Sequence, residues 1–164
     1  MQALAPALRH LPRLEQLILS RNNISEAGAA ALAHASADGA LPRLRILHLE
    51  DNHIGEGGVQ ALAAAVAGGA LATLAELDLA LNEVGAGAEA LAAACASADA
   101  LPQLKFFDLR DNRIDVAGMQ ALVMAIAGGG LAALEKVYLE SVRNPCSAEP
   151  VEAALRQRRL GRES

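Results

Sequence analysis

The sequence predicts an α/β solenoid of about five repeats, a right-handed arc with parallel strands on its inner, concave face and helices on its outer, convex face. Two observations lead to this prediction. Similar segments begin at Leu11, Leu41, Leu71, Leu101 and Leu131, and a fixed period of this length is typical of repeat proteins. Within each period, leucines alternate with other residues and a helical pattern follows, which predicts one short strand and one helix per repeat.

The period organises the 164 residues into one predicted domain. Its first ten residues match the helix of a repeat whose strand is missing. We therefore expect either a fragment of a longer array or a chain covered at this end by a partner subunit, because terminal repeats need a cap. The predicted parts are a partial repeat helix at 1–10, full repeats at 11–40, 41–70, 71–100 and 101–130, and a degenerate last repeat with a C-terminal cap at 131–164.

Each predicted strand is followed by an asparagine where the chain must turn. A buried amide both donates and accepts hydrogen bonds, so these side chains are expected to satisfy backbone groups of adjoining repeats. The column breaks at Val142, where we expect the stack to end. Its members are Asn22, Asn52, Asn82 and Asn112.

The helical segments carry apolar residues three and four positions apart, such as Val59, Leu62 and Val66, which predicts one buried stripe per helix. In the third repeat Leu91 arrives one position early, and one extra residue in the helix or following loop is expected to restore the register. Glycines at 68–69 and 128–130 are expected to end their helices, because a left-handed residue there has a low cost in glycine.

The C-terminal segment PVEAALRQRRL reads as an amphipathic helix. Val151 and Leu155 lie on its predicted buried side, which we expect to cover the last strand and helix. Four arginines lie elsewhere on it and are expected to form a solvated face; contact with an acidic partner is the alternative. They are Arg156, Arg158, Arg159 and Arg162.

The first four repeats share the pattern L-x-x-L-x-x-L-x-L-x-x-N-x-I, with Phe107 and Val84 as conservative exceptions, followed by G-x-x-A-L-A, in which Val123 closes the fourth copy. This resembles the leucine-rich repeat of the ribonuclease-inhibitor-like subclass, with similar repeats in NOD-like receptors and the Ran GTPase-activating protein. The resemblance implies inhibition, sensing or scaffolding of other proteins through the concave surface. Regulation of a small GTPase is an alternative that it implies, although no residue here carries over as catalytic.

The composition favours a protein partner over the other classes. A net charge of −5 does not favour nucleic acid, because phosphate binding needs clustered Lys and Arg. No apolar run approaches the roughly 18 residues of a membrane span. Cys95 and Cys146 make no disulfide framework and are read as reduced thiols, which predicts an intracellular and cytoplasmic protein. No cofactor is predicted.

Residues that alternate with the strand leucines are expected to point to the concave face, where they vary in type from repeat to repeat. Packing fixes the core columns, whereas positions free of packing can be fitted to an irregular partner. We therefore predict a non-catalytic protein-binding surface, part of a scaffold or of a larger assembly. Its predicted residues are Gln16, Ile18, Ile46, His48, Glu50, Glu76, Asp78, Phe106, Asp108, Arg110, Lys136 and Tyr138.

Three side chains in this set, His48, Asp78 and Asp108, are expected about 5 Å apart on successive strands. They could form a metal site or a paired-carboxylate catalytic site. The preferred interpretation is a mixed polar face with Arg110 and Lys136 as counter-charges, because a shallow sheet excludes little water. We therefore predict no metal and no catalytic residue.

Two further patterns are explained by the repeat itself. Residues 85–90 fit G-x-G-x-x-A before a helix, a weak dinucleotide-binding signal. Several residues separate them from the strand, however, where that fingerprint needs an immediate strand-to-helix turn. Cys95 falls at a core position, so packing is preferred over catalysis.

Residues 58–67 and 118–127 contain no charged side chain, although a solvent-facing helix is normally rich in Lys and Glu. Val123 and Met124 are expected outside the buried stripe. They either pack under the C-terminal segment or contact another protein on the convex side. The second possibility supports an alternative function as a purely structural subunit.

The strands alone offer roughly 250–300 Å² of concave sheet, well below the about 800 Å² per partner of a stable interface. We therefore expect the neighbouring turns to join the contact, or the convex and edge surfaces to be used as well. The turn residues are Arg21, Asp51, His53, Asp111 and Arg113.

Overall fold

The structure, a computed structural model, describes residues 4–140 and 147–163. Strands of three residues alternate with helices along this part of the chain. In order, the elements are α1 (Leu4–Leu8), β1 (Gln16–Ile18), α2 (Glu26–Ala37), β2 (Ile46–His48), α3 (Gly55–Ala67), β3 (Glu76–Asp78), α4 (Gly87–Ala94), β4 (Phe106–Asp108), α5 (Val116–Ala127), β5 (Lys136–Tyr138) and α6 (Glu149–Glu163).

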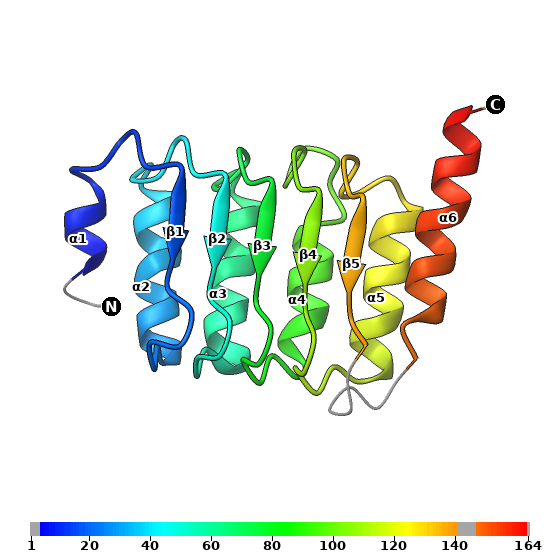
Figure 1. Ribbon diagram of the computed structural model, residues 1–164, viewed down its shortest axis with the longest axis horizontal. Helices are drawn as coiled ribbons and strands as arrows, with labels where there is room; N and C mark the ends of the chain where they lie inside the picture. The colour runs from blue at the N-terminus through cyan, green and yellow to red at the C-terminus, as the bar shows by residue number, and fades with distance from the viewer. Residues whose placement is uncertain (1–3, 141–146, 164) are drawn as a thin grey trace.

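The strands form one parallel sheet in the order β1-β2-β3-β4-β5. Each pairing joins residues thirty positions apart, as in Leu17 with Leu47 and Leu47 with Leu77. Helices α2 to α5 form a second layer behind the sheet, α1 lies at one end and α6 at the other (Figure 1). The predicted α/β solenoid with parallel strands and a separate helix layer is therefore confirmed.

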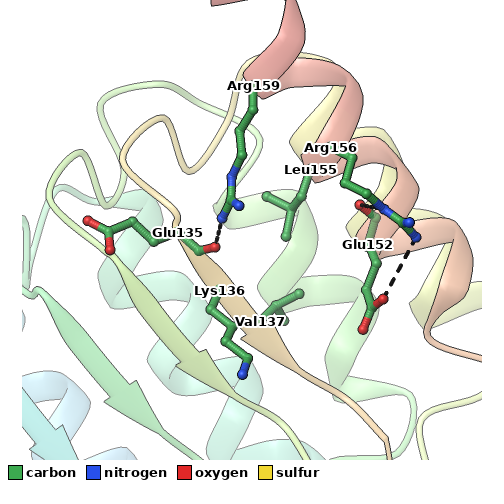
Figure 2. Close-up of a pocket in the computed structure, with 7 residues that line it drawn as sticks. All are labelled: Glu135, Lys136, Val137, Glu152, Leu155, Arg156 and Arg159. Carbon is green, nitrogen blue, oxygen red and sulfur yellow. Dashed lines mark hydrogen bonds and ion pairs between the residues drawn. The ribbon is translucent and has the colours of Figure 1, made fainter.

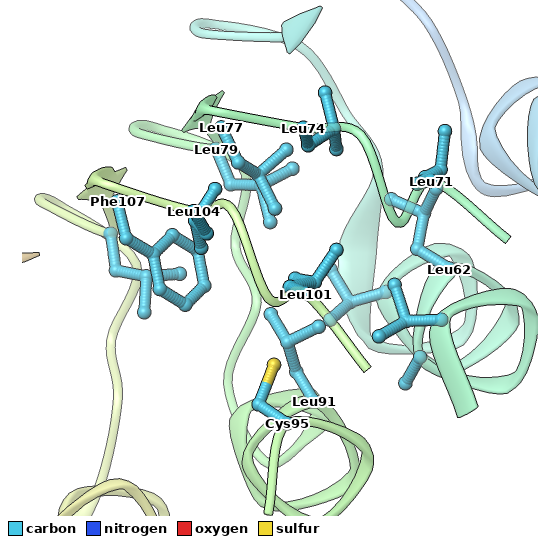
Figure 3. Packing of buried hydrophobic residues seen from close by; sticks show 14 of the residues in the cluster. Leu62, Leu71, Leu74, Leu77, Leu79, Leu91, Cys95, Leu101, Leu104 and Phe107 are labelled. Atoms are coloured by element: carbon cyan, nitrogen blue, oxygen red, sulfur yellow. The ribbon is translucent and has the colours of Figure 1, made fainter. Parts of the chain in front are cut away.

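One continuous apolar core lies between the two layers. Phe107 stands where β1, β2 and β3 carry leucine, and it is fully buried beside Leu104 and Leu79 (Figure 3). Burying a side chain of this size contributes about 1.5–3 kcal/mol. Leu17 of β1 and the following Leu19 are only half-buried, whereas Leu47 and Leu49 are fully buried, because β1 has a neighbouring strand on one side only.

The predicted asparagine column forms a ladder between repeats. The amide nitrogen of Asn82 donates to the carbonyl oxygens of Leu49 in the preceding repeat, at 2.8 Å, and of Leu79 in its own, at 3.1 Å. The Asn112 amide oxygen accepts the backbone N–H groups of Asn82 and Val84. The amides of Asn52, Asn82 and Asn112 thus each join two repeats where the strand ladder has ended. Val142, the predicted break, lies outside the described residues.

The third repeat departs from the others in the way that the sequence predicts. Helix α4 has eight residues, against twelve or thirteen in α2, α3 and α5. Leu91 and Leu101 are ten positions apart, whereas Leu62 and Leu71 are nine apart. The extra residue therefore lies after α4, and the strand register is regained at β4.

Helix α6 packs beside α5 and buries Val151 and Leu155, as predicted. The expectation that all four arginines form a solvated face is wrong. Arg158 is half-buried and donates to the carbonyl oxygens of Gly130, at 2.9 Å, and Leu134, at 3.2 Å. These two hydrogen bonds attach α6 to the last repeat. Among the described residues, no helix is both long and apolar enough for a membrane span.

Candidate functional site

The face of the sheet opposite the helices, here called the open face, carries the two predicted columns of side chains. The strand register places Ile46 beside Glu76 and Glu76 beside Phe106 in one column. In the other column, His48 lies beside Asp78 and Asp78 beside Asp108. The candidate binding residues of five repeats are therefore brought onto one surface.

His48 does not pair with its strand neighbour Asp78. Its Nε2 lies 2.9 Å from Oε1 of Glu76, two residues before Asp78 on β3. The diagonal contact is possible because side chains on one face of neighbouring strands lie within reach of each other. The centre of the open face is thus crossed by a His–carboxylate pair whose side chains are 27% and 38% exposed.

Asp78 is a half-buried carboxylate with acidic neighbours on the same face. Burial raises its pKa above the ordinary value, and the nearby charges of Asp108 and Glu50 raise it further. The hydrogen bond from the Ala80 N–H at 2.9 Å and the charge of His48 lower the pKa but do not cancel the rise. Ionised Asp78 is therefore a local source of instability.

We expect Asp78→Asn to unfold at a higher temperature than the wild type at pH 7. The folded pKa lies above the unfolded value of 3.8, so ionisation above both values costs stability, and the cost disappears below both. The gain should shrink as pH falls through the raised pKa towards 3.8. Thermal melting between pH 3.5 and 8 measures it, with exposed Asp99→Asn as control. A gain that does not change with pH would contradict this cause.

Asp108 was predicted as an accessible binding residue, but only 9% of it is exposed. The Arg110 guanidinium covers it, and the Arg110 N–H donates to Oδ1 at 3.0 Å. Arg110 thus acts as the expected counter-charge. Lys136 instead lies 4.3 Å from the centre of the Tyr138 ring, which Arg110 approaches at 5.4 Å. Charge at this end of the face is therefore presented by Arg110 and Lys136 around one aromatic ring.

The geometry separates the three side chains that were considered for a metal or acid–base site. His48 binds Glu76, Asp78 accepts from a backbone N–H, and Asp108 is covered by Arg110. Within residues 4–140 and 147–163, no three His, Cys, Asp or Glu side chains converge as metal ligands would. The three side chains therefore make separate contacts on a mixed polar face.

A hollow of about 160 Å³ opens on the same face beside Ile46 and Phe106. Its floor is Ala75, which precedes β3, and Arg45 and Glu15 border it. Glu15, Arg45 and Ala75 were not among the predicted binding residues, because the first predicted column begins at Gln16 and its equivalents, one residue later in each repeat. The signal was nonetheless present, since the column Glu15, Arg45, Ala75, Lys105, Glu135 has one small member between long ones.

Residues 85–90 do not form a phosphate cradle. Glu56 from the preceding repeat places Oε1 3.2 Å from the backbone N–H of Ala86, next to the first residue of α4. A carboxylate already occupies the position at which a phosphate would accept from the helix N-terminus.

Cys95 is fully buried at the end of α4, and burial raises the pKa of its thiol to about 12. A thiol in this state is a poor nucleophile, which agrees with the packing interpretation. Cys146 lies outside the described residues.

The two candidate residues on the helix side have different surroundings. Met124 on α5 is 72% exposed. Val123 is half-buried against the core, so the expectation that its position lies outside the buried stripe is wrong. The equivalent Ala63 is buried as well, because the buried face of these helices is wider than the leucine stripe alone.

A second hollow, of about 360 Å³, lies between β5 and α6 (Figure 2). Its polar side chains are engaged with neighbouring groups. Arg156 pairs with Glu152 on the same helix at 3.9 Å, and Arg159 donates to the carbonyl oxygen of Glu135. In the preceding repeat, the carbonyl oxygen of Lys105 accepts the backbone N–H groups of Glu135 and Lys136 of the next strand segment. Arg159 therefore takes the place of a further strand, and this hollow belongs to the cap.

Comparison with known proteins finds a family match for three of the repeats. Residues 10–33, 41–63 and 101–123 match the family described as Leucine Rich repeat. Each matched segment contains one strand and the first part of the following helix, so three repeats of the solenoid are similar to leucine-rich repeats. The matched segments leave out the third repeat, whose helix is displaced. A search of curated proteins finds no match to the chain.

Proposed function

We propose that this chain is a non-catalytic protein-binding module that recognises its partner through the open face and the adjoining turns. Leucine-rich repeats suggest an interaction role in general. The observation that carries the specific proposal is the chemistry of the open face. The strand positions that face the core mostly repeat leucine. The positions on the open face instead change from apolar to acidic to basic within five strands.

The accessible aromatic and aliphatic side chains are suited to anchor a partner. Phe106 is 38% exposed and Ile18 is 62% exposed, and Ile46 borders the small hollow. Aromatic side chains next to charged groups are typical of the few residues that dominate binding energy. The small area of the strands implies that the turns also contribute, in a scaffold or a subunit of a larger assembly.

The test is affinity purification of the tagged chain from its own source, followed by measurement of affinity for the recovered partner. We expect the triple variant His48→Ala, Phe106→Ala, Tyr138→Ala to bind at least tenfold more weakly than the wild type, because truncating central anchors typically costs more than about 1 kcal/mol each. Circular dichroism checks that the variant remains folded.

A matched control places three alanines on the helix side, at Glu89, Gln120 and Met124, which are all exposed. This control should bind as the wild type does. Loss of the partner in the control with retention in the open-face variant would contradict the proposal.

That reversed outcome would favour a second function, a structural subunit in a larger complex. Two observations point to it. Met124 and Val116 on α5 are exposed apolar residues, at 72% and 60%, and the half-buried Leu17 and Leu19 leave the β1 end of the core incompletely covered. A structural subunit would be recovered with a fixed set of proteins, which open-face substitutions would leave unchanged.

A further inference from the structure

A larger hollow, of about 460 Å³, lies at the edge of the sheet where the chain enters the strands. It exists because the third repeat carries small residues between longer ones. Thr73 and Ala75 form its floor, while repeats two and four supply the walls. Strand spacing places these walls about 9.6 Å apart. The residues that form the walls are Arg43, Arg45, Gln103 and Lys105.

Three of the four wall residues are cationic, in a chain with a net charge of −5. Arg43 and Arg45 are exposed, and within the described residues neither lies within ion-pair distance of an acidic side chain. Lys105 pairs with Glu135 at 3.1 Å, in a contact half open to solvent. Arginine forks bind carboxylates in two-point contacts, so the hollow offers unused anion-binding capacity.

The opposite edge of the sheet, where the strands end, is different. Arg21 lies 3.8 Å from Asp51, and Arg113 lies 3.7 Å from Glu83. Each pair joins two neighbouring repeats, so the cations of that edge are neutralised within the protein. Within the described part of the chain, Arg43 and Arg45 differ from Arg21 and Arg113 in having no such acidic neighbour, so their guanidinium groups can bind an external group.

We propose that the hollow binds an acidic, extended polypeptide segment of the partner, with two carboxylates separated by one residue. This rests on the proposed function and specifies the partner's chemistry. Alternate side chains of an extended chain lie about 7 Å apart, so one carboxylate reaches the Arg43 and Arg45 side while the other reaches Lys105. The adjoining hollow shares Arg45 and Ala75 and receives an apolar side chain between Ile46 and Phe106.

Glu15 distinguishes a polypeptide from a polyanion. Glu15 borders both hollows, so a nucleic acid or polyphosphate would bring further negative charge next to an acidic residue. A peptide can carry only the two carboxylates that face the cationic walls, with neutral residues beside Glu15, whereas a polyanion carries a charge at every unit.

The test is selection of random twelve-residue peptides displayed on phage against three folded proteins. These are the wild type, the double variant Arg43→Glu, Lys105→Glu, and the control Arg13→Glu. Arg13 is an exposed arginine of the same edge that does not line the hollow. We expect acid-x-acid peptides from the wild type and the control. The double variant should lose them, and the best wild-type peptide should bind it at least tenfold more weakly at low salt.

The inference is overturned if acidic peptides are not enriched on the wild type, whether other binders or none appear. It is also overturned if the double variant selects the same peptides, or if inorganic phosphate binds the hollow as tightly as the peptides. Selection against the open-face triple variant separates this failure from that of the proposed function. Binders that depend on Phe106 but not on Arg43 or Lys105 would leave the proposed function intact.

Discussion

Asn112→Ala is expected to lower the free energy of unfolding by about 4 kcal/mol. The amide oxygen of Asn112 accepts the backbone N–H groups of Asn82, at 2.8 Å, and Val84, at 3.3 Å. Its amide nitrogen donates to the carbonyl oxygen of Leu79 in the preceding repeat. All these groups are buried, and each donor left without a partner costs about 1–3 kcal/mol. Alanine removes all the side-chain hydrogen bonds by which Asn112 joins repeats three and four.

Asn22→Ala provides the matched control. Asn22 occupies the same position in the first repeat but is exposed, and its amide nitrogen donates to the carbonyl oxygen of Ser20. Water can replace that bond, so the expected loss is below about 1 kcal/mol. Urea unfolding followed by circular dichroism is the suitable measurement, because the chain has no tryptophan. Equal losses in the two variants would contradict the ladder's role.

The asparagine ladder, the strand register and the two layers could be predicted because the residues that produce them recur in several repeats. One asparagine indicates little by itself. Four asparagines at a thirty-residue spacing, each after an alternating leucine segment, indicate where each strand ends and where the turn after it begins. The parallel pairing follows in turn, since about thirty residues with a helix connect each strand to the next. Packing requirements recur in every repeat, and recurrence is the signal that a sequence makes visible.

The details of the open face could not be predicted in the same way, because each contact there occurs once. His48 has acidic residues both beside it and diagonally, and only the side-chain geometry selects Glu76. Asp108 is buried because Arg110, two residues later, folds over it. The hollow above Ala75 exists because this position has no long side chain. Alanine carries no functional group, so the sequence contains little sign of the hollow.

The third repeat has a consequence for the fourth that a residue-by-residue reading does not reveal. Gly130 occupies the position held by Ala40, Ala70 and Ala100 in the earlier repeats. Because α4 ends early, the chain after it approaches Gly130 closely. A Cβ atom on Gly130 would overlap the carbonyl oxygen of Cys95 and lie 3.0 Å from the Cα of Ala96. The glycine thus compensates for the irregular helix of its neighbour.

We therefore expect Gly130→Ala to lower the free energy of unfolding by about 3 kcal/mol, although alanine is the ordinary residue of this column. The backbone at residue 130 is not free to move away from this overlap. Its N–H donates to the Ala125 carbonyl oxygen, and its own carbonyl oxygen accepts from Arg158. Gly68→Ala is the control, because its Cβ would make ordinary contacts of 3.4 and 3.5 Å. Urea unfolding should show little change or a small gain for that control. A near-neutral Gly130→Ala would mean that the segment after α4 can move away, and the proposed compensation between the two repeats would then be wrong.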